Sequence, residues 1–397
     1  MSELKVTLIG ALLTAIGPLS LALYTPAMPE LVSYFNSTHA AVQLTVTVYF
    51  FGFAVTQLVC GPLSDGLGRR PVILAFMLIY VVACGIILAA PTIEVMLAAR
   101  FLQGIGAAVG VAIARAIVRD VFADARAIKI MNLMGLFIAI APAVAPTIGG
   151  LTLEVAPWQM LFVLMGLVGL FIMGVTIFSL RETISRDLSR IRPRALIGSY
   201  RTLLNHRYFM LASMVVAFSI GAIYALATIL PFVLMNQIGL SPTAFGLSQI
   251  LQAGSYALGA LAVQTALRWV YANALIPVGL TLLLTNSLLL ILFNLFSEPT
   301  FLNVMLPLAG FSFGVAFILP AMLTNSLMPF PHMAGAASAL TAFLQMVTGL
   351  LTSALASLFS DPSTALATLV PAAAGAAFIC WVAWRKSPVP ELPMTAA

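Results

Sequence analysis

Long blocks of apolar residues, separated by short polar segments, repeat along the whole of this 397-residue chain. A helix needs about 20 consecutive apolar residues to cross the hydrocarbon core of a bilayer. Windows of that length predict an all-α integral membrane protein with about twelve transmembrane helices, six on either side of one longer polar segment. The predicted spans lie near residues 6–28, 41–62, 72–90, 95–117, 128–151, 158–180, 208–235, 244–266, 272–296, 302–327, 334–358 and 364–384.

The longest polar segment, residues 181–207, separates the two sets of spans. It predicts a basic linker between an N-terminal six-helix bundle at 1–180 and a C-terminal six-helix bundle at 208–397. Its amphipathic pieces suit either of two environments, the membrane surface with its anionic headgroups or water as a solvated loop. Seven arginines lie in it: Arg181, Arg186, Arg190, Arg192, Arg194, Arg201 and Arg207.

Composition excludes a separate water-soluble domain. Hydrophobic residues make up 62% of the chain and charged residues only 8%, against about 25% charged residues in ordinary globular proteins. The net charge of +6 comes from short basic clusters between apolar blocks, a pattern that reflects membrane topology and not nucleic-acid binding. Cys60, Cys84 and Cys380 lie in or at the ends of apolar blocks and follow no disulfide or metal-ligand spacing.

The distribution of charge between the loops predicts which end faces the cytoplasm. With the N-terminus inside, sixteen of the eighteen lysines and arginines lie in cytoplasmic segments, and the opposite loops contain none. Because basic residues are retained in cytoplasmic loops, we expect both termini to be cytoplasmic. The first apolar block is longer than a signal-peptide core and has no clear cleavage site, so we expect it to stay as the first span. The opposite loops contain Glu30, Glu94, Glu154, Glu298 and Asp361 instead.

A tight polar turn, from Gly61 to Pro71, joins the second and third spans. Gly61 and Gly68 allow two helices to approach closely, and Asp65 is suited to cap a helix end or to pair with a neighbouring arginine. If the protein is a carrier whose two halves rock against each other, breaking such a pair would release one of its conformational states. The same residues also suit a charged turn that only sets the topology, and spacing alone leaves both interpretations open.

Arg100 is the one cation deep within a predicted span. It lies about 8 Å inside the fourth span, counted from Val95 at roughly 1.5 Å per residue, where an unpaired cation costs at least ~2.5–3.5 kcal/mol. Gln103 and Gly104 share its face of the helix, so this face presents a cation, an amide and a gap for close packing. Arg100 is therefore a functional candidate. The alternative is a structural tether that bonds to neighbouring backbone carbonyls.

The turn between spans two and three resembles the signature loop of the major facilitator superfamily. Gly66 departs from the pattern, because the family usually has a basic residue at that place. The loss of that residue is expected to loosen one charge contact between helices. The matching residues are Gly61, Asp65, Gly68, Arg69 and Arg70.

Further stretches of the N-terminal half strengthen the resemblance. Arg100, Gln103 and Gly104 resemble the family's Arg-x-x-Gln-Gly motif. In span five, the segment 141–150 is similar to the antiporter motif that ends in Gly-Pro-x-x-Gly-Gly, with Ala145 in place of the first of those glycines. Segments 24–29 and 114–120 extend the likeness to the bicyclomycin- and chloramphenicol-resistance branch of the drug:proton antiporters with twelve spans.

The resemblance implies two six-helix bundles related by a pseudo-two-fold axis, a site near the bilayer midplane and alternating access by rocking. It also implies a monomeric secondary active transporter that exports a small organic molecule, a drug or a metabolite, across the bacterial inner membrane without a cofactor or a metal. Two alternatives stay open. One is export of an anionic metabolite or siderophore, and the other is a uniporter or importer that is not coupled to protons.

One departure bears on energy coupling. The resembled branch usually has an aspartate in span one to which proton uptake is attributed, and Ala22 stands there. No Asp or Glu lies within a predicted helix core, so the candidates for proton coupling are Glu30 and Asp120 at the ends of spans. With Arg100 unopposed by an acid, a positively charged cavity would favour anionic or zwitterionic substrates over lipophilic cations.

Two sets of residues follow as candidates for the transport site and its gates. Aromatic and amide side chains within spans are suited to line a mostly apolar pocket, and equally suited to hold helices together. The substrate-binding candidates are Arg100, Gln103, Tyr24, Tyr49, Gln57, Tyr224, Gln249, Gln252, Asn325 and Gln345. The conformational-gating candidates are Gly61, Asp65, Gly68, Arg69, Arg70, Pro142, Pro146, Gly149 and Gly150.

Other functional classes find no support in the residues. An intramembrane enzyme would need clustered nucleophiles, acids or metal ligands at membrane depth, and the three histidines all lie in loops. An ATP-driven pump would need a phosphate-binding loop such as G-x-x-x-x-G-K-[ST], which the sequence lacks. We therefore expect a carrier and not an enzyme.

Overall fold

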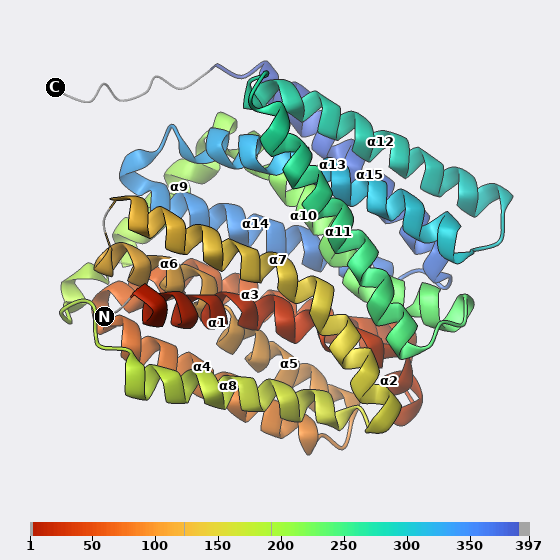
Figure 1. Cartoon of the computed structure of the whole chain (residues 1–397), viewed down its shortest axis with the longest axis horizontal. Coiled ribbons are helices and arrows are strands. Elements are labelled where there is room, and N and C mark those ends of the chain that lie inside the picture. The colour runs from red at the N-terminus through yellow and green to blue at the C-terminus, as the bar shows by residue number, and fades with distance from the viewer. Residues whose placement is uncertain (1–2, 123, 192, 389–397) are drawn as a thin grey trace.

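The computed structural model describes residues 3–122, 124–191 and 193–388, and the secondary structure in these ranges is helical. Figure 1 shows the helices packed side by side. Arg192, one of the seven linker arginines, lies outside the described residues.

In the first half the helices are α1 (Glu3–Ala22), α2 (Met28–Tyr34), α3 (His39–Leu67), α4 (Arg69–Leu88), α5 (Ile93–Ala107), α6 (Val109–Val121), α7 (Asp124–Val155) and α8 (Gln159–Ser179). The linker contains α9 (Pro193–Asn205). The second half consists of α10 (Arg207–Pro231), extended by a π-helical turn at Phe232–Gln237, then α11 (Pro242–Ala266), α12 (Ala272–Phe296), α13 (Phe301–Leu327), α14 (Ala334–Ala356) and α15 (Pro362–Arg385).

Ten helical segments of the described residues are long and apolar enough to cross a membrane. Two further helices, α7 with 32 residues and α11 with 25, also have the length that a bilayer requires. In lipid no water can bond the backbone, so every span must satisfy its own N–H and C=O groups as a helix. The prediction of an all-α membrane protein with about twelve spans is confirmed.

Two predicted spans are built from shorter helices. The first passes from α1 through a 3-10 turn at Thr25–Ala27 into α2, where Pro26 and Pro29 lack the N–H that an uninterrupted helix needs. The fourth changes from α5 to α6 at Ala108. Hydropathy alone marks both stretches as continuous, because it measures the apolar length of a segment and not the path of its backbone.

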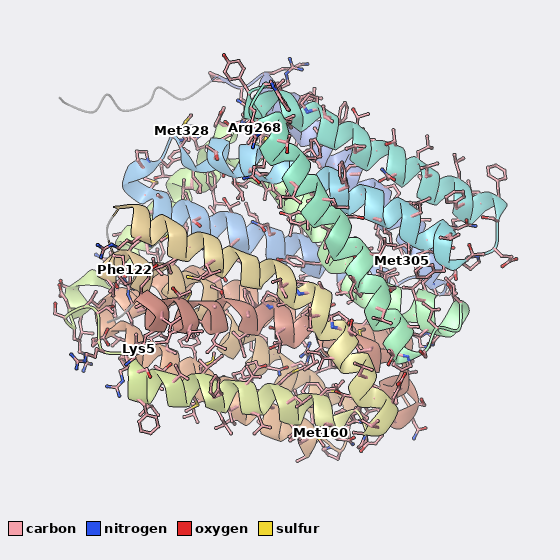
Figure 2. The ribbon with its side chains drawn as sticks, in the orientation of Figure 1. Lys5, Phe122, Met160, Arg268, Met305 and Met328 are labelled. Atoms are coloured by element: carbon pink, nitrogen blue, oxygen red, sulfur yellow. The ribbon has the colours of Figure 1, made fainter. Side chains whose placement is uncertain are left out.

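The two ends of the bundle differ in charge. One end, called the acidic end below, has Glu94 in the first turn of α5, Glu154 in the last turn of α7 and Asp361 directly before α15. The other end, called the linker end, has α9 and the turn between α3 and α4. In Figure 2 Lys5 and Phe122 lie at the linker end, far from Met160 near the acidic end.

Buried apolar side chains form two main clusters that follow the two halves of the chain. The first is drawn from residues 6–180 together with Phe232, and the second from residues 208–384. A third, small cluster joins Leu203 of the linker helix to Phe209 and Leu340, with Leu58 of α3 packed against it. The linker helix is therefore part of the packed structure at the linker end.

The halves come into backbone contact where α7 packs on α11. A side-chain carbon at Gly150 would collide with the carbonyl oxygen of Pro242, and one at Gly246 with that of Pro146. This contact lies toward the acidic end. In Figure 1 the two helices diverge from there toward the linker end.

Within the first half, α3 and α5 are in equally close contact. A side-chain carbon at Gly104 would collide with the backbone oxygen of Tyr49, and one at Gly52 with that of Phe101. The gap predicted at Gly104 is thus filled by the backbone of α3. Nothing lies within 4 Å of the same position at Gly174 of α8.

Gly104→Ala is therefore expected to destabilise the protein by about 1–3 kcal/mol, the cost of overpacking, although alanine is the better helix former. Gly174→Ala is the matched control and should leave stability unchanged or raise it. Thermal unfolding of the two purified variants measures the difference. Equal unfolding midpoints would contradict the close contact between α3 and α5.

Candidate transport site

Arg100 lies at the centre of an aromatic cluster in the first half. Its guanidinium carbon is 4.3 Å from the ring centroid of Tyr24 and 4.6 Å from that of Tyr49, distances at which the face of a ring attracts a cation. A third ring, that of Phe162, is 6.0 Å away. Nη1 of Arg100 donates a 2.5 Å hydrogen bond to Oε1 of Gln103. Four of the candidate residues from the sequence, Tyr24, Tyr49, Arg100 and Gln103, thus share one cluster.

Hydrogen bonds fix the two tyrosines that flank the guanidinium. The hydroxyl oxygens of Tyr24 and Thr45 are 2.6 Å apart. The hydroxyl of Tyr49 donates to the carbonyl oxygen of Gly17 at 3.0 Å. Because these partners lie on α3 and α1, the rings are held between two helices, and their faces stay turned toward Arg100.

The amide of Gln103 is oriented by Arg100. Its oxygen accepts the hydrogen bond from the guanidinium, and its nitrogen Nε2 lies 3.2 Å from Sγ of Cys84 and 3.4 Å from Sδ of Met165. Sulfur atoms are weak acceptors. The charge-assisted bond to Arg100 is therefore the stronger of the contacts that hold this side chain.

Arg100 is fully buried, with 0% of its surface exposed. In the described part of the chain no carboxylate lies within salt-bridge distance of it, and its Nε and Nη2 have no hydrogen-bond partner. An unpaired buried donor is costly, so the rings and Gln103 provide the compensation. The cluster around the guanidinium is closed to solvent.

Of the other candidates within spans, Tyr224 lies at the interface between the halves. The ring of Tyr224 on α10 is 5.3 Å from that of Phe50 on α3. Gln57 and Gln252 are buried, and each keeps one amide atom without a partner, Oε1 and Nε2 respectively. Two more glutamines are half-buried, Gln249 on α11 and Gln345 on α14.

Asn325 has a different environment. Its Nδ2 donates a 2.8 Å hydrogen bond to Oδ1 of Asn273, which joins α13 to α12 within the second half. The side chain is therefore engaged as a tether between two helices, the alternative role that polar residues in spans can take.

At the linker end, Arg69 holds α3, α4 and α6 together. Its Nη1 is 2.5 Å from Oδ1 of Asp65 and 2.6 Å from Oγ of Ser64, and its Nε is 3.0 Å from Oδ2 of Asp120. Arg69 is 6% exposed. Asp65 therefore makes the pair that its position allowed, and Asp120 is engaged with the same arginine.

Glu30, the other acid considered for proton coupling, is exposed near the acidic end.

Glu182 is a site residue that the motifs did not reveal. Its Oε1 accepts a hydrogen bond from the backbone N–H of Arg69 at 2.8 Å, and its Oε2 accepts one from that of Arg70 at 3.1 Å. The carboxylate thus caps the first turn of α4, where the helix dipole attracts negative charge. The partners are 113 residues apart, and no local pattern in the sequence marks Glu182 as a cap for that helix.

The linker fills the space beside Gly66. The backbone N–H of Asp187 donates to the carbonyl oxygen of Gly66 at 2.9 Å, and a side chain at Gly66 would collide with Ile191. The linker therefore fills the space in which the family's usual basic side chain would lie. The loosening expected from the loss of that residue is opposed by this packing.

The linker helix makes a second contact with the first half. The hydroxyl of Tyr200 donates a 2.7 Å hydrogen bond to the carbonyl oxygen of Leu58 near the linker end of α3. Burial raises the pKa of Tyr200 to about 12, so this hydroxyl stays protonated and remains a donor at neutral pH. α9 is thus bound to α3 as well as to the second half.

The paired glycines of span five allow α7 to pack against both halves. A side-chain carbon at Gly149 would collide with the carbonyl oxygen of Leu23, whereas Gly150 faces Pro242 of α11. Pro146 is buried in this contact and Pro142 is exposed. In the signature loop, Gly68 has a positive φ of 102°, which suits glycine. Nothing lies within 4 Å of a side-chain carbon placed at Gly61, so the close approach of two helices expected at Gly61 is not found.

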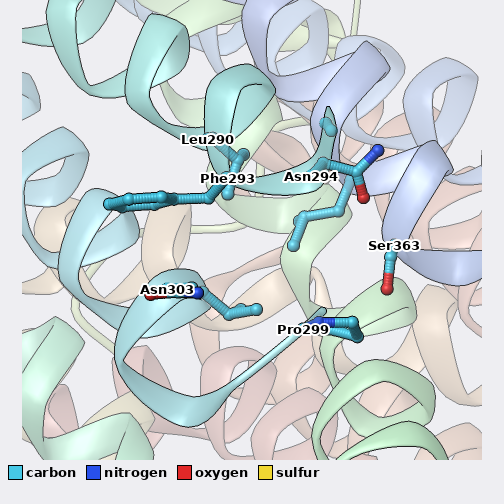
Figure 3. A pocket seen from close by; sticks show the side chains of 9 residues that line it. Leu290, Phe293, Asn294, Pro299, Asn303 and Ser363 are labelled. Atoms are coloured by element: carbon cyan, nitrogen blue, oxygen red, sulfur yellow. The ribbon is translucent and has the colours of Figure 1, made fainter. Parts of the chain in front are cut away.

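Figure 3 shows a cavity in the second half, near the acidic end. Asn294, Asn303 and Ser363 are among the residues that line it, and its volume is about 20 Å³, enough for roughly one water molecule. The lining residues all belong to α12, α13 and α15 or the loop that joins α12 to α13. This cavity is too small for an organic substrate and is separate from the cluster around Arg100.

Two packed groups of long apolar helices that share an interface are the architecture of a membrane transporter. Residues 10–353 match the Major Facilitator Superfamily, and the chain belongs to this family. The family that the motifs indicated is therefore confirmed. The protein is a multi-pass membrane protein and a secondary transporter for small molecules, not an enzyme.

The chain is similar to known relatives over most of its length. It is 28% identical over 358 residues to "Uncharacterized MFS-type transporter YdgK" of Bacillus subtilis (strain 168). The aligned region covers 89% of this chain and 88% of that protein. It is 30% identical over 336 residues to "Multidrug resistance protein MdtL" of Salmonella typhimurium (strain LT2), which covers 83% of this chain and 82% of that protein.

Two solved structures share the fold. A bacterial homolog to the human lysosomal transporter Spinster, in an inward-facing and unoccupied conformation, has a TM-score of 0.74 at 15% identity and covers 96% of both chains. A D-xylose-proton symporter has a TM-score of 0.75 at 13% identity, covering 98% of this chain and 99% of that one. At these identities the likeness concerns the fold alone.

Gln103→Leu is expected to destabilise the protein by about 1.5–3 kcal/mol, because it leaves a buried guanidinium without its hydrogen bond to the amide. The double variant with Arg100→Leu should recover most of that loss, since both polar groups are then replaced by apolar ones. Thermal unfolding of the single and double variants forms a mutant cycle. Strictly additive losses would mean that the two side chains do not support each other.

Proposed function

We propose that this chain exports a small organic molecule, a drug or a metabolite, across the inner membrane of a bacterium, and that it does so as a monomer. The relatives named multidrug resistance proteins, similar over 83% of this chain, support this task. So does the resemblance of the N-terminal motifs to the bicyclomycin- and chloramphenicol-resistance branch of the drug:proton antiporters.

The proposed mechanism is alternating access, and it rests above all on the contact between α7 and α11. Gly150 and Gly246 bring the two backbones together toward the acidic end, and the helices separate toward the linker end. By the distribution of basic residues the linker end belongs in the cytoplasm. Substrate therefore enters from the linker end, and it leaves once the contact at the acidic end has opened.

The bonds across the halves near the acidic end are suited to repeated opening. Nε2 of Gln43 donates to the carbonyl oxygen of Thr228 at 3.4 Å, and the hydroxyl oxygens of Thr47 and Ser353 are 2.8 Å apart. These partners are neutral, so their separation breaks no ion pair. The ionic contacts of Arg69 lie within the first half at the other end, where they keep α3, α4 and α6 moving as one body.

Export of an anionic metabolite or siderophore is the second candidate. Arg100 has no carboxylate partner among the described residues, and two of its nitrogens have no acceptor. Such a guanidinium is suited to bind a carboxylate or phosphate group. In this mechanism the substrate's negative charge displaces Tyr24 or Tyr49 and takes up the free donors. A uniporter or importer without proton coupling is the remaining alternative.

Transport by the purified protein in liposomes tests the function. We expect an applied pH gradient to drive uptake of organic solutes beyond equilibrium, with anionic solutes preferred over lipophilic cations. Arg100→Ala should reduce transport of the anions at least tenfold, the value of one lost charge-assisted contact of about 1.4 kcal/mol. Arg268→Ala, at an exposed site, is the control. If every solute only equilibrates across the membrane, both under the pH gradient and in a counterflow assay, the protein is a uniporter and the proposal of export is contradicted.

Neutral variants of the two peripheral acids test the coupling. Asp120→Asn weakens the contact with Arg69, so it should slow transport both with and without a pH gradient. Glu30→Gln should slow only gradient-driven transport, because its side chain makes no contact with Arg69. Initial rates in the same liposomes measure both. Gradient-driven transport that survives both changes would show that neither acid is the proton carrier and that the substrate itself carries the proton.

A further inference from the structure

A groove runs along the outside of the first half between α1 and α8. Its volume is about 350 Å³. The walls are mostly apolar, and Leu8 and Phe171 are largely exposed on them, at 48% and 59%. Its linker end is polar and has Lys5 on α1 and Ser179 on α8, and Figure 2 shows Lys5 at that end of the molecule. The full lining is Lys5, Leu8, Ile9, Ala11, Leu12, Ala15, Phe171, Val175 and Ser179.

The groove exists because small residues face a bulky neighbour. Ala11 and Ala15 leave space on α1, and the antiparallel α8 places Val175 and Phe171 opposite them. Lys5 near the start of α1 and Ser179 at the end of α8 lie at the same end of the groove, because the two helices run antiparallel. An apolar groove on the outer face of a membrane bundle is in contact with lipid and not with water.

The depth of the groove matches one leaflet. From Lys5 to Ala15 is roughly ten residues, or about 15 Å at 1.5 Å per residue. This is half of the roughly 30 Å hydrocarbon core. A chain that enters at Lys5 and ends near Ala15 would therefore reach from the headgroup level to the middle of the bilayer, as one acyl chain does.

The charge at the linker end of the groove favours one kind of lipid headgroup. Lys5 is exposed there, and the hydroxyl of Ser179 adds a hydrogen-bond donor. The nearest acid in sequence, Glu3, is two residues away, and residues two apart do not share a helix face. A cation at the headgroup level favours anionic lipid. We propose that this groove is a binding site for one anionic phospholipid, with its phosphate at Lys5 and Ser179 and an acyl chain along Leu12 and Phe171.

Native mass spectrometry of the detergent-purified full-length protein tests the site, with phosphatidylglycerol and phosphatidylcholine of identical chains as probes. Wild type should retain one phosphatidylglycerol at concentrations where phosphatidylcholine is lost. Lys5→Gln should weaken this binding about fivefold, the contribution of one lysine near anionic lipid, and Lys5→Arg should preserve it. Arg268→Gln removes a cation elsewhere at the linker end and should change nothing.

A second pair of variants tests the acyl-chain part of the site. Ala15→Phe, or Ala15→Leu if the first does not fold, fills the deep end of the groove and should reduce phosphatidylglycerol retention without touching the charge. The thermal midpoint should rise with phosphatidylglycerol in wild type and not in Lys5→Gln. The proposal is overturned if both lipids are retained equally, or if retention is the same in wild type, Lys5→Gln and the Ala15 variants.

Discussion

Direct contact between helix backbones is the constraint on which the arrangement of this protein depends. In a bilayer the surrounding lipid is as apolar as the helices, so association relies on close packing and on hydrogen bonds between helices. Gly52 and Gly104 join α3 to α5 in this way, and Gly150 and Gly246 join α7 to α11. The first contact lies within one half and the second between the halves. The same device therefore serves both the packing within one half and the contact that the proposed mechanism requires to open.

A buried cation is the second feature that shapes the first half. Arg100 is enclosed by rings and one amide, and it retains two nitrogens without partners. Such an arrangement is expensive in a membrane protein, and a purely structural role would be better served by an apolar side chain. Anion binding, as proposed above, would give this cost a function, behind two tyrosines that are themselves hydrogen-bonded to neighbouring helices.

The charges at the linker end form a connected assembly. Arg69 bonds to Asp65 and Asp120, and Glu182 caps the helix that begins at Arg69. The linker then continues from Glu182 over Gly66 to α9, which packs against the second half. The segment that joins the two halves is thus attached to the signature loop of the first half and packed against the second.

The fold class followed from the sequence because the signal is local. A run of about 20 apolar residues is sufficient to specify a membrane helix, so the number and approximate limits of the spans could be derived without knowledge of their neighbours. The family followed from short motifs around Asp65, Arg100 and Pro146. The interruptions of the helices at Thr25–Ala27 and Ala108 were not predicted, because hydropathy does not record the path of the backbone.

The candidate site was only partly predictable, and the reason is again physical. The sequence determined that a cation lies deep in span four, that Gln103 and Gly104 share its face, and that span one lacks the usual acid. Only the tertiary structure decided that Tyr24 and Tyr49 close over Arg100, that Asn325 bonds to Asn273, and that Glu182 caps α4. These contacts join residues far apart in the chain, and hydropathy and helical periodicity describe one segment at a time.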